Sequence, residues 1–192
     1  MASTCTSGKV ACWISDQAQV LTNIANNLLP VERLITGSAY LIGLAFAFKA
    51  IQSLKSFGEQ KTMMSSGGSL KEPLTYILIA AILIYFPTAV GIFMKSTFGD
   101  SNVLQYAPID SSNSTIDALF GSGSIVGRPL TIIIQTIGLV AFVRGWVLIA
   151  RAAGQGSQPG SSGKGMMHVF GGILAINIVG TLEILNKTLY GT

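Results

Sequence analysis

The sequence predicts an all-α membrane protein whose four transmembrane helices form two tandem, parallel-repeat helical hairpins. Three observations support this prediction: an unusually hydrophobic composition, four apolar segments of membrane-spanning length, and a short sequence that is repeated once. Of the 192 residues, 49% are hydrophobic and only 10% are charged, and the mean hydropathy is +0.58. An ordinary soluble domain has about 25% charged residues, so this chain has too few charges to cover a soluble surface.

The apolar segments are residues 34–54, 74–94, 130–150 and 169–189. Each is close to the ~20 residues that a helix needs to cross ~30 Å of hydrocarbon. Backbone groups inside a membrane must be satisfied within the spanning structure, which favours helices, and no segment alternates like a barrel strand. None has the continuous polar face of a soluble amphipathic helix. We expect Pro87 to kink the second span or to end its regular part.

Two apolar stretches are nearly the same. IGLAFAFK at 42–49 returns as IGLVAFVR 95 residues later, at 137–144. Each is followed by a Gly/Ser-rich turn, SSGGSLKEP at 65–73 and SSGKGMMH at 161–168, and then by another apolar span. Since each copy holds two spans, both copies insert the same way up, as parallel repeats.

The repeat divides the chain into four parts. Residues 1–33 form an outward-facing N-terminal tail, and residues 34–94 form the first two-helix hairpin unit. A periplasmic connection covers 95–129, with a short helix expected at about 115–120, and the second hairpin unit covers 130–192.

The distribution of Lys and Arg predicts the orientation. Cations gather in the short segments 55–73 and 151–168, so these loops should be cytoplasmic, with both termini and segment 95–129 in the periplasm. Two more cations, Lys49 and Arg144, close the repeated phrase about five residues inside the cytoplasmic helix ends. They either snorkel to lipid phosphates or belong to a ring of cations around a lumen. The candidate lipid-headgroup or lumen cations are Lys49, Lys55, Lys61, Lys71, Arg144, Arg151 and Lys164.

Small and polar residues within the spans predict helix-packing faces. The candidates are Ala39, Gly43, Ala47, Ala141, Gly145 and Asn177. Aromatic residues near span ends are expected to anchor the helices at the membrane interface, namely Tyr76, Tyr85, Trp146 and Tyr190. The two cysteines, Cys5 and Cys12, lie in the outward tail, where an oxidising periplasm permits a disulfide; two separate thiols are the alternative.

Little in the sequence points to catalysis. His168 is the only histidine and has no partners at metal-ligand spacing, so we expect an interfacial side chain and no metal site. The segment PGSSGKGM at 159–166 lacks the first glycine and the Ser or Thr of a phosphate loop. No Asp or Glu lies near the centre of a predicted span, which disfavours a pump. We therefore expect no enzymatic activity and no cofactor, with bound phospholipid as a candidate ligand.

The four spans, the basic Gly-rich loops and the paired IGL…K/R and SSG phrases resemble the IcmC/DotE group of inner-membrane proteins. That group belongs to the Dot/Icm type IVB secretion system and related conjugation systems, and it is similar to the sister components DotV and IcmD/DotP. Each half, from IGLAFAFK to PTAVG and from IGLVAFVR to GTLEI, also resembles the hairpin of a type IV secretion pilin. No pilin-type leader is visible, so a fixed ring or channel component is expected rather than a filament.

The resemblance implies a non-enzymatic structural subunit of the bacterial inner-membrane channel of a type IVB secretion or conjugation apparatus. The expected partners are other inner-membrane subunits and membrane lipids, in a hetero- or homo-oligomer, with no direct nucleic-acid binding. The alternative is a self-sufficient small membrane channel or transporter that forms a homo-oligomer, because duplicated hairpins are common in such proteins.

Overall fold

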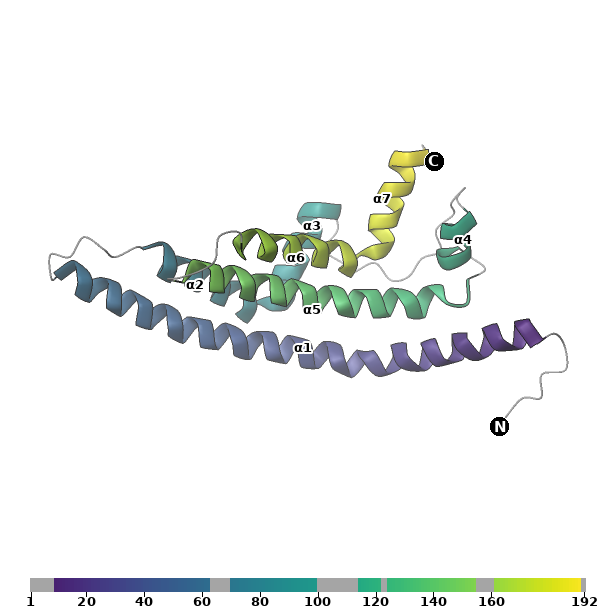
Figure 1. Ribbon diagram of the computed structural model, residues 1–192, viewed down its shortest axis with the longest axis horizontal. Helices are drawn as coiled ribbons and strands as arrows, with labels where there is room; N and C mark the ends of the chain where they lie inside the picture. The colour runs from purple at the N-terminus through teal and green to yellow at the C-terminus, as the bar shows by residue number, and fades with distance from the viewer. Residues whose placement is uncertain (1–8, 63–69, 100–113, 122–123, 155–160, 191–192) are drawn as a thin grey trace.

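The computed structural model describes residues 9–62, 70–99, 114–121, 124–154 and 161–190. Within these residues all regular structure is helical, which confirms the predicted all-α class (Figure 1). The helices are α1 (Lys9–Thr62), α2 (Lys71–Ile84), α3 (Phe86–Phe98), α4 (Ser114–Phe120), α5 (Gly127–Ala153), α6 (Ser161–Ile176) and α7 (Ile178–Tyr190).

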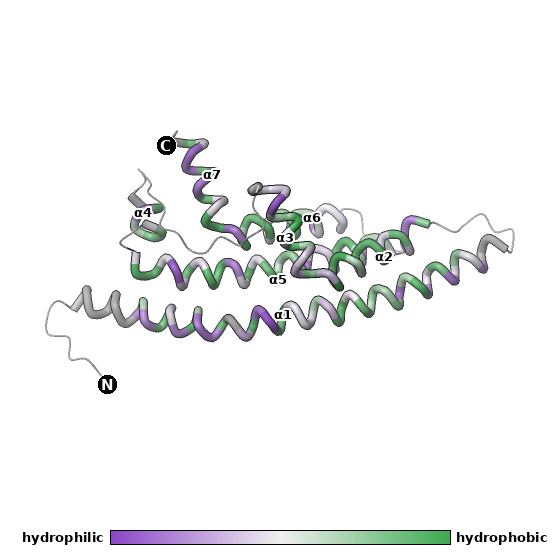
Figure 2. The backbone as a smooth tube through the Cα atoms, turned by 180° about the vertical axis from the view of Figure 1, so that it is seen from behind, coloured by the Kyte–Doolittle hydropathy of each residue, from purple (hydrophilic) through white to green (hydrophobic). Residues whose placement is uncertain are grey.

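Two of the helices, α1 and α5, are each long and apolar enough to cross a membrane. The second and fourth predicted spans are broken instead of straight: α2 and α3 meet at 95°, and α6 and α7 meet at 90°. The described chain therefore holds two candidate spans, or up to four if each bent pair counts as one. In Figure 2 the hydrophobic colour runs along α2, α5, α6 and the C-terminal half of α1.

The two long helices α1 and α5 pack side by side and run in the same direction (Figure 1). From their common end α2 returns along α1 and α6 returns along α5, so each long helix has an antiparallel partner. After the bends, α7 leaves the bundle, and α4 lies near the start of α5 (Figure 1).

The first bend has a simple covalent cause. Pro87 is the second residue of α3 and has no backbone N–H with which to continue the helix. The last regular bond of α2 is donated by the Tyr85 N–H to the Ala81 carbonyl at 3.0 Å. The regular part of the predicted second span thus ends just before Pro87, as expected.

The second bend depends on Asn177, which is 1% exposed. Its Oδ1 accepts a hydrogen bond from the Gly180 N–H at 3.0 Å, the geometry of a helix N-cap for α7. The Thr181 hydroxyl is 2.9 Å from the Leu174 carbonyl and 2.9 Å from the Asn177 carbonyl, on the two sides of the break. We expected Asn177 to mark a packing surface; in the structure it caps a new helix.

Glycines bring α5 and α6 into backbone contact. A Cβ added to Gly145 would lie 2.7 Å from the Val169 nitrogen, and one added to Gly172 would lie 2.7 Å from the Phe142 nitrogen. Gly138 and Gly165 are equally tight, and each helix has its two glycines seven residues apart. Any larger side chain at these positions must push the two helices apart.

An aromatic cluster links α3 to α5. Phe142 is fully buried, with ring centroids of Phe86 at 5.9 Å, Phe93 at 5.6 Å and Trp146 at 6.0 Å. The prediction that Trp146 and Tyr76 anchor the interface is wrong, because they are only 8% and 1% exposed. Their large apolar rings belong to the buried core instead. Tyr85, by contrast, is 68% exposed.

The segment read as a tail is largely helical. Residues 9–33 continue into the first span without a break, even through Pro30, so α1 has 54 residues and a length of about 80 Å. The helix expected at 115–120 is α4, and segment 95–129 also holds the last turn of α3 and the start of α5. A helix of this length exceeds the ~30 Å hydrocarbon core more than twofold.

Neighbouring glycines of α6 provide a matched test of the backbone contact. We expect Gly172→Ala to lower the free energy of unfolding by about 1–3 kcal/mol, because the new methyl group overpacks the contact with α5. Gly171→Ala should be neutral or stabilising by up to about 1 kcal/mol, since nothing lies within 4 Å of its added Cβ and alanine favours helix. Thermal unfolding in mild detergent, followed by circular dichroism, measures both; equal effects would contradict the tight α5–α6 contact.

The cap at the second bend can be tested separately. Asn177→Ala should cost about 1 kcal/mol or more, because it removes the cap and leaves a buried N–H unsatisfied. Asn177→Ser should recover part of this loss, since serine also caps helices. The control is Asn26→Ala at an exposed position of α1, where little change is expected. A stability of Asn177→Ala equal to that of the control would show that the bend does not depend on the cap.

Candidate functional site

A groove with a volume of about 470 Å³ lies between α1 and α5. Its walls are mainly aliphatic, and two arginines of α5 border it. Among the described lining residues there is no Asp or Glu. The lining residues are Ile35, Ser38 and Ile42 of α1 and Val140, Val143, Arg144, Val147, Leu148 and Arg151 of α5.

Arg144 and Arg151 are seven residues apart, two turns along the same face of α5, and both are exposed. A guanidinium group stays charged at any physiological pH and offers five N–H donors in a planar fork that matches phosphate oxygens. An apolar groove with such groups at its border has the chemistry to hold an amphiphile with an anionic head and a hydrocarbon tail.

Arg144 also borders a second cavity, of about 280 Å³, that Thr136, Ile137, Val140, Ala141 and His168 complete. The Nδ1 of His168 donates a hydrogen bond to the Lys164 carbonyl at 2.9 Å. This bond ties the single histidine to the first turns of α6. Arg144 therefore stands between two apolar hollows on either side of α5.

Lys49, the partner of Arg144 in the repeated phrase, has different surroundings. Its Nζ lies 4.8 Å from the ring centroid of Tyr76, a cation–π distance. Phe46 stacks on the same ring at 6.0 Å, so the lysine sits at the contact between α1 and α2. Lys49 does not line the α1–α5 groove. The two cations that the sequence pairs are thus not brought to one site.

The remaining candidate cations are spread over the loop-side ends of the helices. Lys55 is paired with Glu59 at 3.8 Å across one turn of α1, and both side chains are well exposed. Such surface pairs contribute little stability. Lys71 and Lys164 are exposed. Lys61 falls in the last turn of α1, but its side chain lies outside the described part of the chain.

Cys5 and the side chain of Cys12 also lie outside the described residues. The disulfide between them therefore stays a prediction.

The packing candidates occupy different places on the helices. Ala39 is fully buried, and Ala47 and Ala141 are half-buried. Gly43 also touches its partner helix: an added Cβ would lie 2.9 Å from the Ile84 nitrogen, directly before the first bend.

Gly138 repeats this contact in the second half. It lies 95 residues after Gly43, and a Cβ on it would lie 2.7 Å from the Ile176 nitrogen, directly before the second bend. Sequence reasoning missed Gly138, Gly165 and Gly172, although their seven-residue spacing in two adjacent spans is a usable signal. Each long helix therefore meets its bent partner through a glycine at the level of the break.

The described residues form no cluster of metal-ligating side chains. No group of three or more His, Cys, Asp or Glu side chains gathers among them to hold a metal ion. Among the described residues, the Thr136 hydroxyl of α5 donates a hydrogen bond to Glu32 Oε1 of α1 at 3.3 Å and so links the two helices. This arrangement suits helix pairing and the binding of an amphiphile.

Comparisons with known proteins leave the family open. No protein-family model matches this chain, and neither the curated proteins nor the solved structures that were searched gave a significant match.

Proposed function

We propose that this chain is a non-enzymatic structural subunit of a bacterial inner-membrane assembly, built from two repeated hairpins. The observation that carries the proposal is the equivalence of Gly43 and Gly138, each of which touches its partner helix directly before a bend. The repeated phrase, the shared order of long helix and bent pair, and the common direction of α1 and α5 (Figure 1) support a tandem, parallel duplication.

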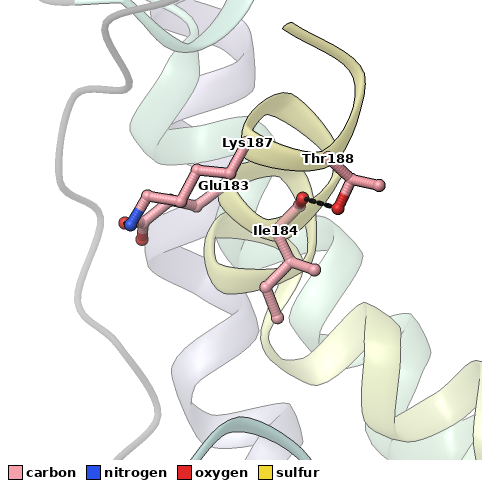
Figure 3. A network of polar contacts seen from close by, with 4 residues as sticks. All are labelled: Glu183, Ile184, Lys187 and Thr188. Atoms are coloured by element: carbon pink, nitrogen blue, oxygen red, sulfur yellow. Dashed lines mark hydrogen bonds and ion pairs between the residues drawn. The ribbon is translucent and has the colours of Figure 1, made fainter. Parts of the chain in front are cut away.

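The proposed orientation places the loops between α1 and α2 and between α5 and α6 in the cytoplasm. The C-terminal ends of α1 and α5 point toward the same end of the bundle (Figure 1), and the nearby cations support this placement. After the second bend, α7 would leave the bundle on the periplasmic side, whereas α3 stays packed against Phe142 and Trp146 of α5. The exposed pair of Lys187 Nζ and Glu183 Oε1, at 3.0 Å on one side of α7 (Figure 3), suits a headgroup region better than hydrocarbon.

The groove between α1 and α5 suits an anionic phospholipid as a structural ligand. Its aliphatic walls would accept an acyl chain, and Arg144 and Arg151 would bind the phosphate. The second hollow next to Arg144 gives a further apolar surface for the same lipid.

The resemblance to the IcmC/DotE group suggests the channel of a type IVB secretion or conjugation apparatus as the assembly. The repeated hairpins and the large exposed apolar surface support a subunit that needs neighbours in the membrane. A self-sufficient channel formed by copies of this chain alone is the second candidate, favoured by the same duplication.

Removing the groove arginines tests the lipid site. The double substitution Arg144→Gln and Arg151→Gln should abolish retention of phosphatidylglycerol by the purified protein from vesicles of phosphatidylglycerol and phosphatidylethanolamine, because the phosphate loses both charged partners. The control is Arg33→Gln with Arg128→Gln, two exposed arginines away from the groove. Bound lipid is measured by native mass spectrometry, and equal retention in both variants would remove the groove from the proposal.

The proposed function is tested by purifying the particle from native membranes in mild detergent and measuring its mass and composition. A large particle with several other membrane subunits is the expected result. A small particle that holds only this chain and conducts solute in vesicles would replace the proposal with the independent channel.

A further inference from the structure

Glu32 of α1 lies level with the interior of α5. The predicted first span begins at residue 34, but the candidate span in α1 runs from Gln17 to Glu59 and so includes Glu32. Its Oε1 is 3.3 Å from the hydroxyl oxygen of Thr136, which stands about 6 Å from the middle of α5. The contact therefore places a carboxyl group in the membrane interior, between the two long helices. Acidic side chains at such depth are rare and mark functional sites.

Glu32 has no cationic partner. Among the described residues it forms no ion pair. Arg33 is exposed, and its long stem can carry the guanidinium toward the headgroups. Arg128 and Arg144 of α5 are each eight residues from Thr136, about 12 Å along the helix axis. The other described charged residues of α1 and of the helices packed against it are Lys49, Lys55, Glu59, Lys71, Glu72, Lys95 and Arg151.

A carboxylate without a counter-charge in hydrocarbon is neutralised by a proton. The surroundings of Thr136 point the same way, because its hydroxyl has one hydrogen and two acceptors. The Thr136 oxygen is 2.9 Å from the Ile132 carbonyl and 3.3 Å from Glu32 Oε1. If Glu32 is ionised, both neighbours compete for this hydrogen, and one contact stays incomplete in a place where Thr136 is only 6% exposed.

A proton on Glu32 removes this competition. Thr136 then donates to the Ile132 carbonyl, and Glu32 donates to the remaining lone pair of the Thr136 oxygen, so both hydrogen bonds form at once. Glu32 is half-buried, so a proton can reach it without opening of the bundle.

The contact lies at one end of the groove between α1 and α5. Ile35 follows Glu32 by one turn of α1, Val140 follows Thr136 by one turn of α5, and both line the groove. Thr136 itself lines the second cavity next to Arg144. Because an ionised carboxyl needs water or a cation, loss of the proton would separate the two helices at this end of the groove.

We infer that Glu32 is a proton-binding carboxyl whose proton holds α1 against α5 and keeps this end of the groove narrow. The inference rests on the membrane-subunit part of the proposed function and not on the secretion apparatus. It adds a control to the lipid site: the groove narrows as the pH falls and opens as the pH rises.

Dicyclohexylcarbodiimide tests for the proton on Glu32. This apolar reagent enters membranes, and the O–H of a protonated carboxyl adds across one of its C=N bonds without loss of any atom. With the full-length chain in vesicles of phosphatidylglycerol and phosphatidylethanolamine, Glu32 should be modified at about pH 6 and progressively less toward about pH 9. Peptide mass spectrometry locates the adduct.

Glu59 and Glu183 are the matched controls for this reaction. Both are exposed, and their Oε1 atoms lie 3.8 Å and 3.0 Å from a lysine Nζ. They should stay unmodified, because a neighbouring ammonium group favours the ionised carboxylate. Equal modification of Glu32 and the controls, or no modification of Glu32, would overturn the inference.

Water access to the groove gives a second readout. In a chain with Cys5→Ser and Cys12→Ser, Ser38→Cys places a thiol in the groove. Its reaction with a water-soluble maleimide should rise with pH more steeply than that of Asn26→Cys, an exposed position of α1 outside the groove that reports the intrinsic reactivity of a thiol.

This additional rise should be lost after Glu32→Gln, because a glutamine amide donates to Thr136 at every pH. The same rise with and without Glu32→Gln would overturn the control of the groove by Glu32. A large native particle in which Glu32 is not modified would refute this inference alone. A modified Glu32 in a particle without other subunits would refute only the secretion assignment.

Discussion

Close contact between helix backbones at glycine is the interaction on which both hairpins depend. In a membrane the lipid tails are as apolar as the side chains, so helices associate through van der Waals packing rather than through hydrophobic burial. Gly43 lets α1 reach the backbone of Ile84, and Gly138 lets α5 reach that of Ile176. Gly145 and Gly172 extend the contact between α5 and α6. Because glycine has no side chain, the two backbones come closer at these points, and the van der Waals attraction between the helices is stronger.

The positions of the glycine contacts also determine which helices stay apart and leave a groove between them. The glycine contacts hold α2 against α1 and α6 against α5 up to the last turns of α2 and α6. Each hairpin therefore changes direction where Pro87 or Asn177 ends the helix. The first bend directs α3 toward Phe142, and the aromatic cluster then joins the two hairpins. The long helices α1 and α5 face each other through branched side chains such as Ile42 and Val143, which hold the backbones apart. The groove with its arginines results from this difference in side-chain size.

Hydropathy and helix-breaking residues predicted the helical class, the short helix α4 and the effect of Pro87. They did not predict the 90° bend at Asn177, because an average over a window does not distinguish a polar residue that packs from one that caps. The burial of Trp146 was missed because an indole at a span end has the same sequence pattern whether it meets headgroups or a phenylalanine cluster. Residues 9–33 were read as a tail because their polar residues lower the hydropathy, while the seven-residue period of Ala18 and Ala25 indicates a helix.

Helix α1 looks like an ordinary transmembrane segment in sequence because apolar residues lie on its buried and on its exposed sides. Ala39 is fully buried and Gly43 touches the backbone of α2, whereas Leu34, Leu41 and Phe48 are 73%, 66% and 68% exposed. Apolar residues on both sides weaken the amphipathic signal, so hydropathy identifies the helix as a span but does not identify its partners. Small residues on the buried side suit the close approach of α2, and the branched Ile35 and Ile42 line the groove toward α5. One helix can thus hold its own hairpin and border the groove with different residues of the same side.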